Sequence, residues 1–332
     1  MICIVLNLLL GISLFLFGLN LMSDHLKKLG ATRLEPVLAR VTKHPLKGLL
    51  LGTGVTAFLQ SSSAVCAMVV GLVESSIIRF QQALPLILGS IAGTAVTGWL
   101  IAYSSLEINA GILSVFSASV ISAVCATGGI ILKLFGKKRN VRRVGELLLG
   151  FAVLMLGIHL ITQAVEPIKG NKALLDWVNR LNFPPLLLCA GLAIAALLQS
   201  ASASVGILQT FSATGAVGFR SCYFLTLGIG IGASLPVLLS SVGKNKQAKK
   251  AALSYLAVNV FGALLGSIIY YIAPIGLLWS DLEMNTITVA ALNTAYRIAV
   301  VLAAFIFRKQ IEKLTAVVFK DKPKVENTAI AK

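Results

Sequence analysis

Two short polar stretches interrupt an otherwise apolar sequence: Leu59-Gln60-Ser61-Ser62-Ser63-Ala64 and Leu198-Gln199-Ser200-Ala201-Ser202-Ala203. Each lies in the middle of a charge-free run, at 48–73 and at 181–219. Serine favours the start of a helix because its hydroxyl accepts a backbone N–H that has no partner in the helix. Each stretch therefore predicts a place where one apolar helix ends and a second begins.

The surrounding sequence is that of a membrane protein. Of its 332 residues, 57% are apolar and 12% are charged, whereas a soluble domain is about one quarter charged. This composition excludes a disordered chain, a disulfide scaffold and an ordinary soluble enzyme. Backbone groups in lipid must bond within their own segment, so the apolar runs are helices and we expect an all-α polytopic membrane protein. The remaining runs lie at 1–23, 80–106, 108–132, 147–165, 221–243, 251–280 and 284–307.

The chain contains an internal duplication. A gap-free shift of 139 residues brings many Gly residues, a Pro and both polar stretches into one register. The matched pairs include Gly11 with Gly150, Gly18 with Gly157, Pro45 with Pro184, Gln60 with Gln199 and Ser63 with Ser202. We interpret 1–135 as unit A and 144–274 as unit B, followed by an extra transmembrane helix at 284–307 and a cytoplasmic tail at 308–332.

Charge placement predicts how the units cross the membrane. The formal net charge of +17 is concentrated in four basic clusters at 24–47, 133–143, 244–250 and 308–332. The positive-inside rule places all four in the cytoplasm, so an even number of crossings must separate neighbouring clusters. Three runs separate the first two clusters, and three more separate the next two. The number of crossings between clusters is even if one run in each set is a re-entrant hairpin, which enters and leaves on the same side. These hairpins are expected at about 48–76 in unit A and about 184–216 in unit B.

This arrangement gives three transmembrane helices and one hairpin per unit, with the second unit inverted. The N-terminus is then expected outside and the C-terminus in the cytoplasm, in a multi-pass protein of the plasma membrane. Basic and apolar residues alternate along 24–47 as in an amphipathic helix on anionic lipid, so membrane lipid is an expected partner and nucleic acid is not. Inverted repeats with broken helices are typical of secondary transporters.

The hairpin tips offer ion-binding groups of both kinds. The second half-helix begins at Ser61–Ser63, and its N-terminus suits an anion. The first half-helix ends at Gln60, where free carbonyls, the amide oxygen and the serine hydroxyls suit a hard cation such as sodium. Gln199, Ser200 and Ser202 repeat this pattern. Arg297 is a charge deep in a span, and its sequence context leaves two roles open: compensation of a bound anion, or an ion pair with a carboxylate.

These residues resemble a known family. The stretch 51–64 is similar to the first signature of the sodium-dependent phosphate cotransporter type II family, and 196–203 to the second. The stretches 88–94 and 227–233 resemble the segment that follows each hairpin. The resemblance, which is to bacterial sodium/phosphate symporters, covers about 8–305. With only about 25 residues after the last span, we expect no C-terminal regulatory domain.

The resemblance implies symport of inorganic phosphate with sodium as the coupling ion, by alternating access, with no other cofactor and no enzymatic activity. It implies a phosphate site and a sodium site that share residues. Substrate would be held by Gln60, Ser61, Ser62, Ser63, Gln199, Ser200 and Ser202. Sodium would be held by Gln60, Ser63, Thr94, Gln199 and Ser202.

The chain departs from the family pattern at four positions. Ile91 and Gly230 replace an asparagine, Ala201 replaces the middle serine of the second motif, and Ala233 stands where Thr94 has its equivalent. These departures leave open a transporter of another small anion on the same scaffold. A membrane-embedded lipid-pyrophosphate phosphatase is the enzymatic alternative, but it needs clustered carboxylates and a metal, which the hairpins do not supply.

Overall fold

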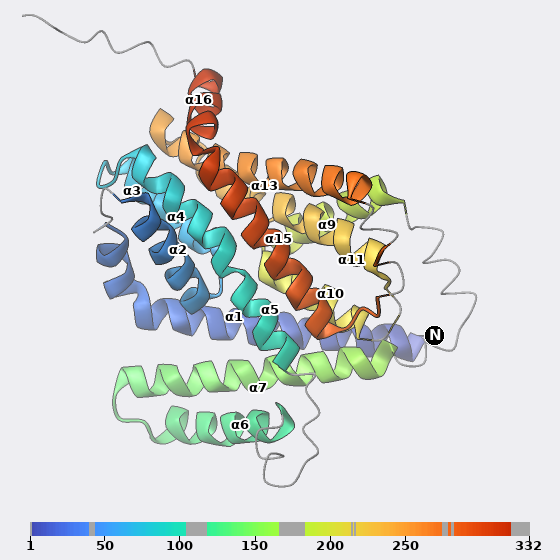
Figure 1. The fold of residues 1–332 in the computed structure, drawn as a ribbon. Helices are drawn as coiled ribbons and strands as arrows, with labels where there is room; N and C mark the ends of the chain where they lie inside the picture. The colour runs from blue at the N-terminus through green and yellow to red at the C-terminus, as the bar shows by residue number, and fades with distance from the viewer. Residues whose placement is uncertain are drawn as a thin grey trace, which may run out of the picture.

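The computed structural model describes residues 2–39, 44–103, 118–165, 183–213, 215, 217–273, 278–279 and 282–319, and these residues are helical wherever they form regular structure (Figure 1). Residues 104–117 and 166–182 and the tail beyond 319 lie outside the described residues, so the predicted span at 108–132 is described from Ala118 onward. Six helices are long and apolar enough to cross a membrane, as expected of a polytopic membrane protein. They are Val5–Leu29, Phe80–Tyr103, Arg139–Ala164, Phe219–Ser240, Lys246–Ile272 and Thr286–Ile306.

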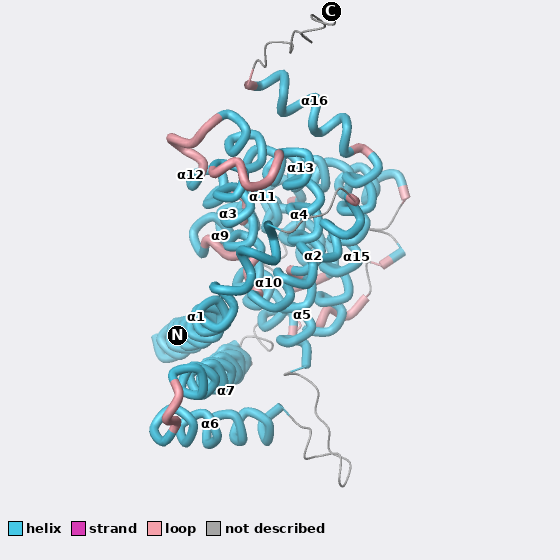
Figure 2. The backbone as a smooth tube through the Cα atoms, turned by 90° about the vertical axis from the view of Figure 1, so that its left-hand side faces the viewer, coloured by secondary structure: helices cyan, strands magenta, loops and turns pink. Residues whose placement is uncertain are grey.

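Three long helices form one side of the molecule. Helix α1 (Ile2–Ala39) packs against α7 (Arg139–Val165), and α7 packs against α6 (Ala118–Phe135). Figure 2 shows these helices nearly end-on, stacked beside the rest of the bundle. Helix α1 continues through Pro36 to Ala39 without a break. The segment from residue 24 to residue 39 is helical and continuous with the first span, and its predicted position on anionic lipid stays a prediction.

Glycines bring α1 and α7 into backbone contact. A Cβ at Gly18 would lie 2.7 Å from the Gly150 carbonyl oxygen, and a Cβ at Gly157 would lie 2.9 Å from the Gly11 carbonyl oxygen. No side chain fits between helices this close, so small residues at these positions set the distance between the two axes. The two contacts exchange under the 139-residue shift, because Gly11 corresponds to Gly150 and Gly18 to Gly157.

The two helix–turn–helix segments occupy the rest of the bundle together with two broken helices. In the first half, α2 (Pro45–Leu59) and α3 (Ser62–Glu74) precede α4 (Phe80–Gly93) and α5 (Ala95–Tyr103). In the second half, α9 (Pro184–Leu198) and α10 (Ala201–Ser212) precede α11 (Phe219–Gly232) and α12 (Leu235–Ser240). The runs expected as spans at 80–106 and 221–243 are each long enough to cross a membrane, with a local irregularity at Thr94 and at Ala233–Ser234 where the dihedral angles stay helical.

Helix α2 runs parallel to α4. The Thr53 hydroxyl donates to the Gly89 carbonyl at 3.1 Å. Gly52 packs against Leu86 and Gly93 packs against Thr56, so residue numbers increase in the same direction along both helices. Since α2 and α4 run in the same direction, α3 must return the chain to the end at which α2 begins. Helices α9 and α11 make the same set of contacts through Gly191, Gly228 and Gly232.

The last helices cover the two hairpins. Helix α13 (Lys246–Ile272) contacts α3, α4 and α11, and α15 (Thr286–Ile306) contacts α4, α5 and α10. Helix α16 (Arg308–Val318) follows and projects from the bundle (Figure 2). Buried side chains of α3, α4, α13 and α15 form the largest apolar cluster, which also includes Leu38 and Ile311.

The described parts of the basic clusters at 24–47, 133–143 and 244–250 lie at the left in Figure 1, and α16 projects at the top. Arg143 donates to the Lys28 carbonyl at 2.9 Å, which joins the first two clusters. The Asn245 backbone N–H donates to the Glu74 carboxylate at 2.7 Å, which places the start of α13 beside the open end of the α2–α3 pair. An even number of crossings between clusters requires this placement.

The helix interfaces predict a contrast between two glycines. A Cβ at Gly89 would collide with the Leu49 carbonyl, whereas a Cβ at Gly71 would meet nothing within 4 Å. Alanine improves helix propensity at both sites by about 1 kcal/mol, but at Gly89 the backbone clash must be relieved, which costs about 1–3 kcal/mol. We expect Gly89→Ala to lower the melting temperature of the detergent-purified protein and Gly71→Ala to leave it unchanged or raised. Equal melting temperatures would show that the α2–α4 contact is not close.

Candidate functional site

The first polar stretch forms a sharp turn between α2 and α3. Gln60 ends α2 in the left-handed conformation, with φ 54°, and its backbone N–H donates to the Thr56 carbonyl at 2.7 Å. Ser61 is extended, and its hydroxyl accepts the Ala64 N–H at 3.3 Å. Two residues thus end one helix and cap the next, as predicted for the polar stretch.

The second polar stretch has the same geometry. Gln199 ends α9 with φ 52°, and the Ser200 hydroxyl accepts the Ala203 N–H at 3.2 Å. A glutamine in the left-handed region is uncommon, and its occurrence at both matched positions links the two turns. The side-chain environments differ, because Gln60 is buried whereas Gln199 is exposed. The structure thus places one predicted glutamine in the interior and the other at the surface.

The two turns meet inside the bundle. The Ser202 hydroxyl, near the start of α10, donates to the Gln60 carbonyl at 3.3 Å and lies 3.4 Å from the Thr97 hydroxyl. The Ser63 hydroxyl donates to the Ala233 carbonyl at 3.1 Å, at the break between α11 and α12. Each hairpin therefore contacts the interrupted helix of the opposite half. These contacts bring Gln60, Ser63 and Ser202 together.

Thr94 and its counterpart lie at the breaks themselves. The Thr94 hydroxyl is buried and donates to the Ser90 carbonyl within its own helix at 3.0 Å, so its oxygen retains acceptor capacity. Ala233 has no hydroxyl, but Ser234 follows it and donates to the Ile231 carbonyl at 2.6 Å. The predicted sodium ligand Thr94 is thus buried between α4 and α5, and among the described residues no hydrogen bond links it to a hairpin.

Two buried oxygens beside the first turn have no hydrogen-bond partner. They are Oε1 of Gln60 and Oγ1 of Thr56, which stand one helical turn apart on the same chain segment. A buried oxygen without a partner costs about 1–3 kcal/mol, so a pair of them is suited to a bound cation or water. Thr56 was not predicted, although its spacing of four residues from Gln60 could have indicated it.

Arg297 is held by Asn293 of its own helix α15 and lies near the first hairpin through Tyr255 of α13. The guanidinium is fully buried, its Nε donates to Asn293 Oδ1 at 2.8 Å, and Nη2 has no partner. It lies within electrostatic range of Tyr255, whose hydroxyl is 3.1 Å from the Ser62 hydroxyl. No carboxylate of the described residues pairs with Arg297, so the ion-pair alternative finds no partner there. A buried cation without an anion is unfavourable by several kcal/mol.

Tyr255 and Asn293 were also missed by the sequence reasoning. Asn293 precedes Arg297 by one helical turn, so the spacing alone could have indicated the contact. Tyr255 could not have been identified, because its contact with Ser62 joins helices far apart in sequence. Gly230 replaces the asparagine of the family pattern, and the side-chain amide of Asn259 lies beside it. A Cβ at Gly230 would be 2.9 Å from Asn259 Oδ1.

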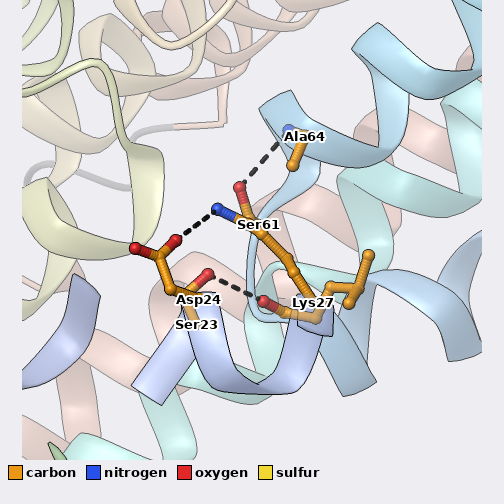
Figure 3. Close-up of polar contacts among 6 residues, drawn as sticks. Ser23, Asp24, Lys27, Ser61 and Ala64 are labelled. Carbon is orange, nitrogen blue, oxygen red and sulfur yellow. Dashed lines mark hydrogen bonds and ion pairs between the residues drawn. The ribbon is translucent and has the colours of Figure 1, made fainter. Parts of the chain in front are cut away.

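Polar residues of α1 border the first turn (Figure 3). The Ser23 hydroxyl donates to the Leu59 carbonyl at 3.2 Å, which satisfies one free carbonyl at the end of α2. One turn further along α1, Lys27 pairs with Asp24 at 3.3 Å, and both side chains are substantially exposed. The first turn therefore faces the buried residues Tyr255 and Arg297 on one side and the exposed charged residues of α1 on the other.

Fold and site together define a polytopic helical membrane protein with two polar helix turns meeting in an apolar bundle. Residues 14–163 match the profile of the Na+/Pi-cotransporter family. The relatives include the uncharacterized protein YqeW of Bacillus subtilis, 28% identical over 76% of this chain and 78% of that protein. The putative inorganic phosphate export protein YjbB of Salmonella typhimurium is 26% identical over 97% of this chain and 57% of that protein.

The sodium-dependent phosphate transport protein 2B of Homo sapiens is 33% identical over 29% of this chain and 14% of that protein. No solved structure matches the chain. The chain is similar to the Na+/Pi-cotransporter family over residues 14–163, which supports the resemblance found in its polar stretches. It spans about half the length of the phosphate export proteins that it matches.

The left-handed conformation of Gln60 allows its backbone and side-chain roles to be separated. Glycine adopts φ 54° without strain, whereas a β-branched residue there costs about 1–3 kcal/mol. We expect Gln60→Gly to retain the wild-type melting temperature and Gln60→Val to lower it. Gln199→Gly and Gln199→Val form a matched pair at the exposed turn. A Gln60→Gly protein that is less stable than Gln60→Val would mean that the turn is not left-handed.

Proposed function

We propose that the protein is a secondary active transporter that couples the movement of inorganic phosphate across the plasma membrane to sodium. The observation that carries this proposal is the meeting of the two polar turns, where Ser202 contacts the Gln60 carbonyl beside unpartnered buried oxygens. Such groups are suited to bind small ions rather than to perform covalent chemistry. Similarity to the Na+/Pi-cotransporter family supports the choice of sodium and phosphate.

In this proposal the anion binds at the helix starts of the two hairpins. Ser61 and Ser200 open α3 and α10, and free backbone N–H groups follow each of them. Helix ends contribute about 1–2 kcal/mol in partly buried geometry, which is too little for phosphate, with its one to two negative charges. Arg297 adds a full positive charge, and the unpartnered Nη2 gives it a donor for the anion.

Sodium supplies the remaining compensation at the ends of α2 and α9. The proposed ligands near the first turn are the predicted residues Gln60, Ser63, Ser202 and Thr94, with Thr56 added from the structure. Gln60 and Thr56 offer hard oxygen atoms without other partners, as an alkali cation requires. Gln199 is exposed in this conformation, so its contribution would require the second turn to close. A cation beside the anion lowers the cost of burying both, which is a physical basis for coupling.

Alternating access follows from an inverted repeat with two re-entrant hairpins. The proposal is supported by the parallel packing of α2 with α4 and of α9 with α11, which returns each hairpin to its starting side. It is also supported by the reciprocal contacts of Gly11, Gly18, Gly150 and Gly157 between α1 and α7. The basic clusters at one end favour a cytoplasmic location for that end, with the N-terminus outside.

Export of phosphate is the second candidate, because relatives matching most of the chain are named as putative phosphate export proteins. Transport of another small anion stays open at Ile91, Gly230, Ala201 and Ala233. The phosphatase alternative has less support, because the described residues contain no group of three or more His, Cys, Asp or Glu side chains.

The proposal predicts a phosphate flux that depends on sodium. Protein reconstituted into liposomes is loaded with radiolabelled phosphate on one side, and flux is measured with a sodium gradient or with choline in place of sodium. We expect the flux to fall at least about tenfold in choline, because one partner of the paired charges is missing. Testing both gradient directions distinguishes uptake from export.

Arg297→Gln provides the matched test of the anion site, and Arg308→Gln on the projecting helix α16 is its control. Loss of the buried charge is expected to raise the phosphate KM by about tenfold or more, while Arg308→Gln remains like the wild type. Flux that is the same in sodium and choline would contradict the coupling, and an unchanged KM in Arg297→Gln would remove Arg297 from the site.

A further inference from the structure

A buried glutamine of the second hairpin joins three helices. Gln209 lies on α10 and is fully buried. Its amide nitrogen donates to the Gly98 carbonyl of α5 at 2.9 Å and to the Thr286 carbonyl at the start of α15 at 2.8 Å. Figure 1 shows α5, α10 and α15 converging in this part of the bundle. One side chain thus links the second hairpin to the first half and to the helix outside the repeat.

The other end of this amide faces the residue that holds Arg297. Gln209 Oε1 and Asn293 Nδ2 are both buried without a partner. A Cβ at Gly98 would lie 3.7 Å from the first atom and 3.8 Å from the second. An unpartnered acceptor and an unpartnered donor therefore flank the same glycine, and the Oδ1 atom of Asn293 accepts the Arg297 Nε–H.

We propose that Gln209 is a positioning residue that couples the second hairpin to Arg297 through Asn293 across the polar space beside Gly98. The inference rests on the proposed function, in which Arg297 holds the anion. Gln209 and Asn293 share no direct hydrogen bond. From Asn293 the connection continues through Arg297 to Tyr255 and to Ser62 at the start of α3. It connects the two hairpins by a route separate from the direct Ser202–Gln60 contact.

This connection is absent from the first hairpin. The residue that corresponds to Gln209 under the 139-residue shift is Val70, which lies in the apolar core. Helix α15 also lies outside the duplicated units. The second hairpin therefore reaches the Arg297 region through Gln209, whereas the first approaches it through Ser62 and Tyr255, so the two hairpins have unequal roles in anion binding. A movement of α10 away from α15 would break the Gln209–Thr286 hydrogen bond and change the polar surroundings of Asn293, which holds the guanidinium.

The test uses the full-length protein in liposomes at saturating sodium, with phosphate KM and maximal rate measured separately. Gln209→Met preserves side-chain length but removes the amide. We expect it to raise the phosphate KM by about tenfold while the maximal rate changes less than about twofold, because ground-state binding is affected. Thr210→Val is the control, since the Thr210 hydroxyl bonds only within its own helix, to the Gly206 carbonyl. Its kinetics are expected to match the wild type.

A double variant distinguishes positioning from general damage. If Gln209 acts through Arg297, Gln209→Met/Arg297→Gln has the same KM as Arg297→Gln alone, whereas independent effects multiply. Gly98→Ala is a second variant that should fold, because its Cβ makes ordinary contacts. It fills the space beside Gln209 and is expected to raise the KM about threefold.

Wild-type KM in both Gln209→Met and Gly98→Ala, or multiplied effects in the double variant, would overturn the inference. If Arg297→Gln loses phosphate affinity while Gln209→Met does not, the proposed function stands without the coupling. If neither variant changes the KM, both the coupling and the role of Arg297 are wrong.

Discussion

The structure depends on the need to end two helices inside an apolar bundle. Each broken end leaves backbone N–H or C=O groups without partners, and in lipid no water replaces them. Gln60 and Gln199 end the first half-helices in the left-handed conformation, and Ser61 and Ser200 cap the second. The groups that remain free are of the kind that bind ions. A requirement of the fold thus produces the chemistry of the site.

Glycine packing allows the broken helices to lie in the bundle. The α2–α4 and α9–α11 pairs approach so closely that backbone carbonyls occupy the positions of absent side chains. Close backbone contact replaces some of the packing that a continuous helix would provide. The same pairing in both halves also positions the turns, because α3 and α10 start where these parallel pairs end. Helix packing and the geometry of the two turns are therefore coupled in this fold.

The turns were predictable because their signal is local. Serine caps, a break in the charge-free runs and the 139-residue register all lie in short stretches of sequence. The local irregularities at Thr94 and Ala233 were not predicted, since each lies within a continuous apolar run. Tyr255, Asn293 and Gln209 join helices far apart in sequence, so neither spacing nor composition identifies the full network. The exposure of Gln199 could not be predicted from a motif that it shares with buried Gln60.

The central claim is that phosphate and sodium bind together where the two turns meet. Equilibrium binding of radiolabelled phosphate to the purified protein tests this claim without the complications of flux. Because coupling between two ligands is reciprocal, phosphate affinity must rise as sodium replaces choline, and sodium affinity must rise with phosphate. The account predicts an increase of at least about fivefold in phosphate affinity, the lower range of typical coupling energies. Equal affinity in sodium and choline would contradict it.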